Sequence, residues 1–351
     1  MYWRVVLVVL AIGGALAPVP AAIVERQYSE MLYPPMQRAL TGLSNLVPFA
    51  LVDGLLVGGV AWLAWQIARA SARRRLDGWR RVSLRLLERV AAAAAILYLV
   101  FLATWGLNYR RVTLMGRVRF DPQAVSASAA RVLALTTVGR VNDLYDPTPS
   151  GDSGEGVVDA SLARAFAQAQ QTLGASRLAR PARPKRTILD VYFKAAGVEG
   201  MTDPYFLETL VVGNLLPFER PFVIAHEWSH LAGFADEGEA NFVGWLTCVR
   251  GSRAERYSGW LFLYGQVAAA LKEAERADIA VRLDPGPRTD LRAAAERVRR
   301  HLSPVIADAG WQIYDRYLKA NRVEAGTGSY AEVVKLILGV RLGSDWAPEM
   351  K

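Results

Sequence analysis

The sequence predicts a mainly helical membrane protein, in which three N-terminal transmembrane helices precede a mostly helical α+β domain with a short sheet. Three long apolar segments, at about residues 5–24, 46–67 and 90–107, predict the membrane region, because each is near the ~20 residues that a helix needs to cross the hydrocarbon core. The rest of the chain is dominated by helical patterns, and residues 207–216 read as a strand. We therefore expect a membrane region at 1–110 and a domain at 111–351.

The first apolar segment admits two interpretations. Arg4, the apolar run and Ala15-Leu16-Ala17 resemble a cleavable signal peptide. The apolar run continues beyond Pro18, which would follow the cut, and this favours an uncleaved helix. Both interpretations place residues 25–45 outside the cytoplasm.

An arginine-rich loop between the second and third segments sets the expected orientation. Arginines that flank transmembrane helices tend to remain in the cytoplasm, and eight gather here: Arg69, Arg73, Arg74, Arg75, Arg80, Arg81, Arg85 and Arg89. The domain is then extracytoplasmic, although half as many arginines follow the third segment, at 110, 111, 117 and 119. Because the basic residues cluster in this way, the net charge of +9 indicates topology and not nucleic-acid binding.

The chain has one cysteine and three histidines, which limits its chemistry. Because Cys248 is the only cysteine, an intramolecular disulfide and cysteine-based zinc sites are excluded. The apolar residues around it predict a buried small side chain. His301 follows two arginines at an expected helix end, where a cation suits the helix dipole. The other two histidines are four residues apart.

These two histidines belong to the run Ala225-His226-Glu227-Trp228-Ser229-His230. Positions i and i+4 share one face of a helix, so His226 and His230 can reach one metal ion together. Glu227 would project toward water at that metal and act as general base. Zn²⁺ suits imidazole and carboxylate ligands. The alternative is a pair of ordinary histidines beside a glutamate.

A third protein ligand is expected just after the motif helix, which Gly233 should end. In the longer zinc motif HExxHxxGxxH the last histidine is the third ligand, but this chain has Asp236 at that position. A carboxylate is therefore expected as the third ligand. Glu239, in the first turn of the next helix, is the first choice and Glu237 the second; otherwise each is an acidic residue favoured by the helix dipole. Asp236 and Asn241 are expected to orient the histidines.

Two further features are weaker candidates. Tyr257 could donate a hydrogen bond to a tetrahedral intermediate, although a packed helix tyrosine is the simpler interpretation. The strand at 207–216 precedes the motif helix and could bind an extended peptide along a sheet edge, or it could be an ordinary strand of the fold.

The run HEWSHLAGFADEGEANFVGWLTC resembles the signature of a bacterial family of uncharacterised membrane proteins with three N-terminal spans and an extracytoplasmic HExxH domain. Residues 105–110, 256–259 and 317–319 extend the resemblance over most of the chain, and Ser229 departs from it where alanine is expected. The family implies a zincin-like domain at the bacterial inner membrane but no established substrate. The run Glu-x-Glu-Ala-Asn is also similar to one in soluble zinc peptidases related to ImmA and IrrE, which implies Glu239 as a ligand.

The expected function is therefore that of a membrane-anchored zinc-dependent peptidase, which hydrolyses peptide bonds of proteins in the cell envelope. The alternative is a non-catalytic zinc-binding membrane protein that acts as an assembly factor or sensor. Glu227 favours catalysis, because a purely structural site does not need it. An intramembrane protease is disfavoured, since the apolar stretch at 221–234 is too short to span.

Overall fold

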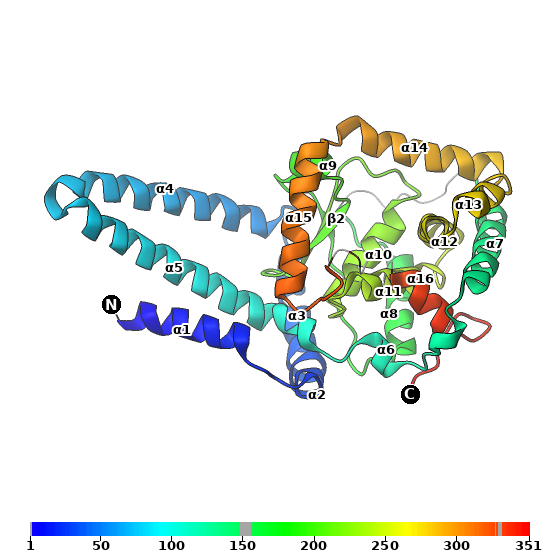
Figure 1. The fold of residues 1–351 in the computed structure, drawn as a ribbon, viewed down its shortest axis with the longest axis horizontal. Coiled ribbons are helices and arrows are strands. Elements are labelled where there is room, and N and C mark those ends of the chain that lie inside the picture. The colour runs from blue at the N-terminus through cyan, green and yellow to red at the C-terminus, as the bar shows by residue number, and fades with distance from the viewer. Residues whose placement is uncertain (1, 148–155, 327, 329–331) are drawn as a thin grey trace.

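The computed structural model describes residues 2–147, 156–326, 328 and 332–351 (Figure 1). Helices dominate, and a small sheet is the main β-structure of these residues. Long helices extend from one side of a rounded domain, as Figure 1 shows. The mainly helical class with a short sheet is thus confirmed.

Two helices are long and apolar enough to cross a membrane, namely α4 (Leu51–Asp77) and α5 (Trp79–Thr104). Gly78 joins them in a left-handed conformation, with φ 74°, which glycine adopts at little cost. The first apolar segment is shorter than expected: α1 (Tyr2–Leu16) ends before Pro18 and packs along α5. It counts as a third span only together with the helical stretch Ala21–Ser44, which is bent from it by 107°.

A junction between α1 and α4 turns the chain across the base of the domain. It consists of α2 (Ala21–Ile23), the π-helix η1 (Val24–Leu32) and α3 (Tyr33–Ser44). Here Glu25 pairs with Arg111 at 2.6 Å and with Arg117 at 3.5 Å. Arg110 donates to the carbonyl of Gly14 at 2.8 Å, near the end of α1. Arg119 lies 3.7 Å from Glu349, so all four arginines that follow α5 have partners inside the protein.

The domain packs its helices around a central pair, α10 (Arg220–Leu231) and α11 (Glu237–Cys248). Every residue of α11 is buried, and Trp228, Phe242 and Trp245 are among the largest fully buried side chains. Cys248 is buried as expected. The other elements are η2 (Gly106–Arg110), α6 (Leu114–Arg117), η3 (Pro122–Ala124), α7 (Ala127–Leu144), α8 (Ala160–Thr172), α9 (Asp190–Ala196), α12 (Arg253–Ala270), α13 (Glu273–Ala280), α14 (Pro285–His301), α15 (Pro304–Ala320) and α16 (Glu332–Gly339).

The sheet has the order β1-β3-β2, with β1 (Pro184–Lys185) parallel and β2 (Gly200–Asp203) antiparallel to β3 (Glu208–Val211). Of the two interpretations of residues 207–216, the ordinary strand holds and the peptide-binding edge strand does not. Only Glu208–Val211 is strand, and this strand lies in the middle of the sheet. The outer strand that packs most closely on α10 is β2.

The membrane region and the domain share one hydrophobic core, which runs across residue 110. The Tyr33 hydroxyl donates to the carbonyl of Leu231 at 3.0 Å, and Trp105 Nε1 donates to that of His230 at 3.2 Å. Both carbonyls belong to the last turn of α10. Tyr33 of the junction and Trp105, which follows α5, thus contribute to the hydrogen bonding of the helix that carries the histidines.

Candidate metal centre

Local sequence brings the start of α11 back against α10. After α10 ends, Gly233 takes a left-handed conformation, with φ 85°, and Asp236 caps α11 by accepting from Glu239 N at 3.1 Å. Gly244 lets the two helices approach closely, because a Cβ there would lie 3.0 Å from His226 N. The first turn of α11 therefore faces the two histidines.

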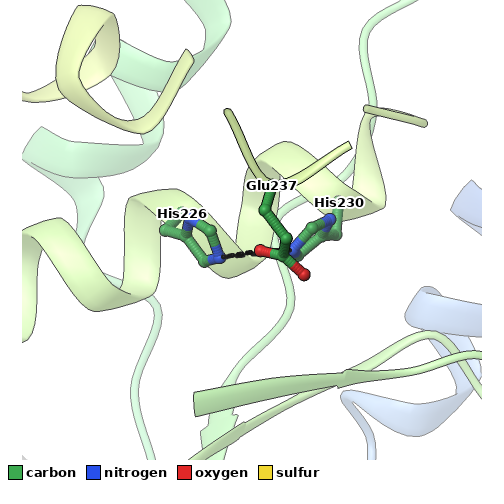
Figure 2. Close-up of side chains that lie close together, drawn as sticks. All are labelled: His226, His230 and Glu237. Atoms are coloured by element: carbon green, nitrogen blue, oxygen red, sulfur yellow. Dashed lines mark hydrogen bonds and ion pairs between the residues drawn. The ribbon is translucent and has the colours of Figure 1, made fainter. Parts of the chain in front are cut away.

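Three potential ligand atoms converge at this point (Figure 2). His226 Nε2 and His230 Nε2 are 3.2 Å apart, and Glu237 Oε2 lies 3.3 Å from the first and 3.5 Å from the second. A tetrahedral ion with bonds of about 2.0–2.1 Å separates its ligand atoms by roughly 3.3 Å. The spacing of the three atoms therefore fits the ligands of one small cation.

The hydrogen bonds of the cluster leave these atoms available. Glu237 Oε2 is buried, and although it lies at ion-pair distance from both imidazoles it makes no well-formed hydrogen bond among the described residues; His226 Nδ1 is also buried without a hydrogen-bond partner there. His230 Nδ1 lies 2.8 Å from the carbonyl of Phe234, which fixes the ring and leaves Nε2 as the coordinating atom. A cation at the cluster would give the Glu237 oxygen a partner.

The cluster is also coupled electrostatically. Burial opposes charge on both groups, yet the two histidines hold the pKa of Glu237 well below its usual range. Burial likewise opposes the charge of His230, but Glu237 raises the pKa of that ring to about 9. Because metal ligands must be deprotonated, a cation bound here would compete with the proton that the raised pKa favours on His230.

Glu239, the first choice for the third ligand, is not among the three groups that converge, whereas Glu237, the second choice, is. The Glu239 carboxylate accepts from Leu114 N at 2.5 Å, and burial raises its pKa to about 7. Residues two apart on a helix point in directions about 200° apart, so only one of Glu237 and Glu239 can face α10. Asp236 also has a different role, since it caps α11. Asn241 is buried in the same helix.

Glu227 lies beside the cluster but outside the three converging atoms. Its Oε2 accepts from the Thr202 hydroxyl at 2.8 Å, and burial raises the pKa of the carboxyl group. Gly200 makes room for its other oxygen, since a Cβ there would lie 2.6 Å from Oε1. Strand β2 thus positions this carboxylate. The sequence analysis missed Thr202 and Gly200, whose separation from the motif gives no periodic signal.

The tyrosine nearest the cluster is not Tyr257. The Tyr257 hydroxyl donates to Asp290 Oδ2 at 2.7 Å and the ring packs against Tyr145, so the expectation that it serves the site is not supported by its position. Instead, the hydroxyl of Tyr314 on α15 donates to Glu237 Oε1. The sequence analysis missed Tyr314, which lies 77 residues from its partner.

The fold and the site together define the class of protein. It is mainly helical, with two helices long and apolar enough to cross a membrane, and its domain holds a largely buried His-His-Glu cluster beside a further buried glutamate. Residues 28–338 match the model of a family described as "Protein of unknown function (DUF3810)". Because the match covers most of the chain, the protein belongs to the DUF3810 family. Comparisons with curated proteins and with solved structures gave no match.

Proposed function

We propose that the protein is a membrane-anchored zinc-dependent peptidase that hydrolyses peptide bonds in the cell envelope. The observation that carries this proposal is the convergence of two imidazole nitrogens and one carboxylate oxygen at 3.2–3.5 Å, with Glu227 beside them and not among them. A site that only binds metal needs the three ligands. The fourth side chain, buried and held in place, is what hydrolysis requires in addition.

His226, His230 and Glu237 would hold the zinc ion, which when bound would supply a Lewis acid that polarises the scissile carbonyl and acidifies water. Glu227 takes a proton from the water while the water oxygen attacks the carbonyl carbon. The same carboxyl group then gives that proton to the leaving amine as the C–N bond breaks. The Thr202 hydroxyl lies 2.8 Å from both Oε2 and the backbone carbonyl oxygen of Glu227, so we assign the proton transfer to the other carboxylate oxygen, Oε1.

The register of the sheet supports a peptide as the substrate. Val212 N donates to the Glu199 carbonyl at 3.0 Å, which makes these two residues a hydrogen-bonded antiparallel pair. Because such pairs alternate, the main-chain N–H and C=O groups of Gly200 and Thr202 point away from β3. An extended peptide could pair with them as an added strand, next to the carboxylate that Thr202 holds.

The proposed location is the bacterial inner membrane, with the domain outside the cytoplasm. The arginine-rich turn between α4 and α5 and the domain lie at opposite ends of these helices (Figure 1). Glu25 pairs with Arg111 and Arg117 and so offsets part of the positive charge that opposes this orientation.

A non-catalytic zinc site is the second candidate, and the burial of the cluster favours it. The side chains of His226, His230 and Glu237 are only 12%, 9% and 3% exposed. Structural zinc sites are closed to solvent, whereas catalytic sites keep one position open. The two candidates differ in what they require of Glu227.

Two substitutions separate these candidates. Glu227→Gln is nearly isosteric and should leave zinc content unchanged while activity falls by ~10²–10⁴-fold, the usual effect of losing a general base. His226→Ala should lose both zinc and activity. Glu239→Gln, a second buried glutamate that does not face the histidines, serves as the control and should keep both.

The measurements are zinc content of the purified protein and a proteomic comparison of membranes that carry each variant. Substrates that accumulate in Glu227→Gln membranes would support the peptidase. If Glu227→Gln membranes matched those with the unaltered chain while His226→Ala membranes changed, the zinc-scaffold function would stand and the peptidase would be rejected.

A further inference from the structure

An apolar surface on α15 and α9 lies beside the membrane helices. Val305 and Ile313 on α15 are 79% and 69% exposed, and Val191 on α9 is 79% exposed. Ile188, just before α9, is 60% exposed. We call these four residues the α15–α9 apolar surface. Large apolar side chains gathered in this way on a protein surface mark a site of interaction.

Hydrogen bonds hold the α9 end of this surface against the first turn of α4, where a candidate span begins. Asp53, in the first turn of α4, accepts from the Thr187 hydroxyl at 2.5 Å and from Ile188 N at 3.0 Å. The candidate span in α4 begins at Leu51. Ile188 therefore lies at the level where α4 leaves the domain for the bilayer.

The other end of α15 meets the end of the second span. The ring of Tyr317 packs edge-on against Phe101, in the last turn of α5, with centroids 6.2 Å apart. Near the middle of α15, Gly310 leaves room for the Tyr192 hydroxyl of α9. Figure 1 shows α15 running across the direction of α4 and α5, and so parallel to the membrane plane.

The order of side chains around α15 places the apolar stripe on the membrane side. Tyr314 points to Glu237, and Tyr317, about 60° around the helix, points to α5. Another ~40° in the same sense brings Ile313, and Val305 lies about 80° beyond it. Asp308 lies about 140° around the helix from Ile313, whereas Arg316, which is exposed, lies between Ile313 and Val305, where a long side chain can carry its charge to the headgroups.

We propose that the α15–α9 apolar surface rests in the outer face of the lipid bilayer, with α15 as an interfacial helix. The two neighbouring spans argue for lipid as the occupant, because they fix the bilayer at the depth of both ends of this surface. Interfacial helices of this kind bury an apolar face about 5–10 Å into the headgroup boundary. This seating does not depend on the chemistry proposed for the metal centre.

The test uses the full chain in vesicles of phosphatidylethanolamine and phosphatidylglycerol, with a fluorescent nitrobenzoxadiazole label on one introduced cysteine. Ile313→Cys reports the apolar stripe, Val191→Cys reports the α9 end, and Asp308→Cys is the matched control on α15. Cys248 is buried and stays unlabelled. Phosphatidylcholine with a doxyl group near the headgroup quenches labels that touch lipid, and iodide quenches labels in water.

Doxyl lipid should reduce the emission of the labels at Ile313 and Val191 by about twofold or more, and should leave the label at Asp308 nearly unchanged. Iodide should act in the reverse order. Quenching of the Ile313 and Val191 labels by iodide alone would show a water-exposed surface and overturn the proposal. Shielding from both quenchers would show a protein partner in place of lipid, and would overturn it as well.

Discussion

Glu237→Gln should weaken zinc binding far more than Glu239→Gln, because only the first carboxylate faces the histidines. Glu237 Oε2 lies 3.3 and 3.5 Å from the two imidazole nitrogens. Loss of a group that merely orients a ligand costs ~10–100-fold in metal affinity. Glu237 is placed as a ligand itself, so we expect a loss of more than about 100-fold, which equals about 2.7 kcal/mol.

Glu239→Gln should change the affinity by less than ~10-fold, a smaller effect than the loss of an orienting group. The amide oxygen of glutamine can still accept the hydrogen bond from Leu114 N. Zinc dissociation constants can be measured on metal-free protein in detergent by competition with a chromophoric chelator. If Glu239→Gln lost the metal while Glu237→Gln retained it, the placement of α11 against α10 would be wrong.

Two further predictions concern packing and orientation. Gly244→Ala should lower the free energy of unfolding by about 1–3 kcal/mol, because the new Cβ would lie 3.0 Å from the backbone of α10. The control is Gly139→Ala, at an exposed helix position where a Cβ would meet no atom within 4 Å, and it should be neutral or stabilising. Equal effects of the two substitutions in thermal unfolding would contradict the close packing of α11 against α10. An impermeant maleimide should label Lys272→Cys from outside the cell, but should label Arg81→Cys only after permeabilisation, and the opposite pattern would reverse the proposed topology.

The motif helix could be predicted from sequence because its signals are local. The spacing of His226 and His230 and the apolar residues around them predict one helix, and the structure places both rings on one face of α10. Two candidate spans could be predicted from the length and apolarity of their segments, although α4 and α5 both begin at residues other than those expected. The first segment was misjudged because Pro18 and Pro20 end α1 early.

The third side chain of the cluster could not be predicted, since it depends on how two helices meet. Glu237 and Glu239 both lie in the first turn of α11, so sequence position alone treats them alike. The turn at Gly233 and the close contact at Gly244 decide which of them faces α10. Tyr314 is positioned only by tertiary packing.

The last turn of α10 has a practical consequence for anyone who wishes to isolate the site. Its Leu231 carbonyl accepts from Tyr33, and its His230 carbonyl accepts from Trp105 as well as from Gly233 N; Tyr33 and Trp105 both precede residue 110 in the chain. A water-soluble fragment that starts at residue 111 would lose both donors and uncover the core face that they occupy. The anchor is thus an integral piece of the scaffold around the histidines, and biochemistry on this protein calls for the whole chain in detergent or nanodiscs.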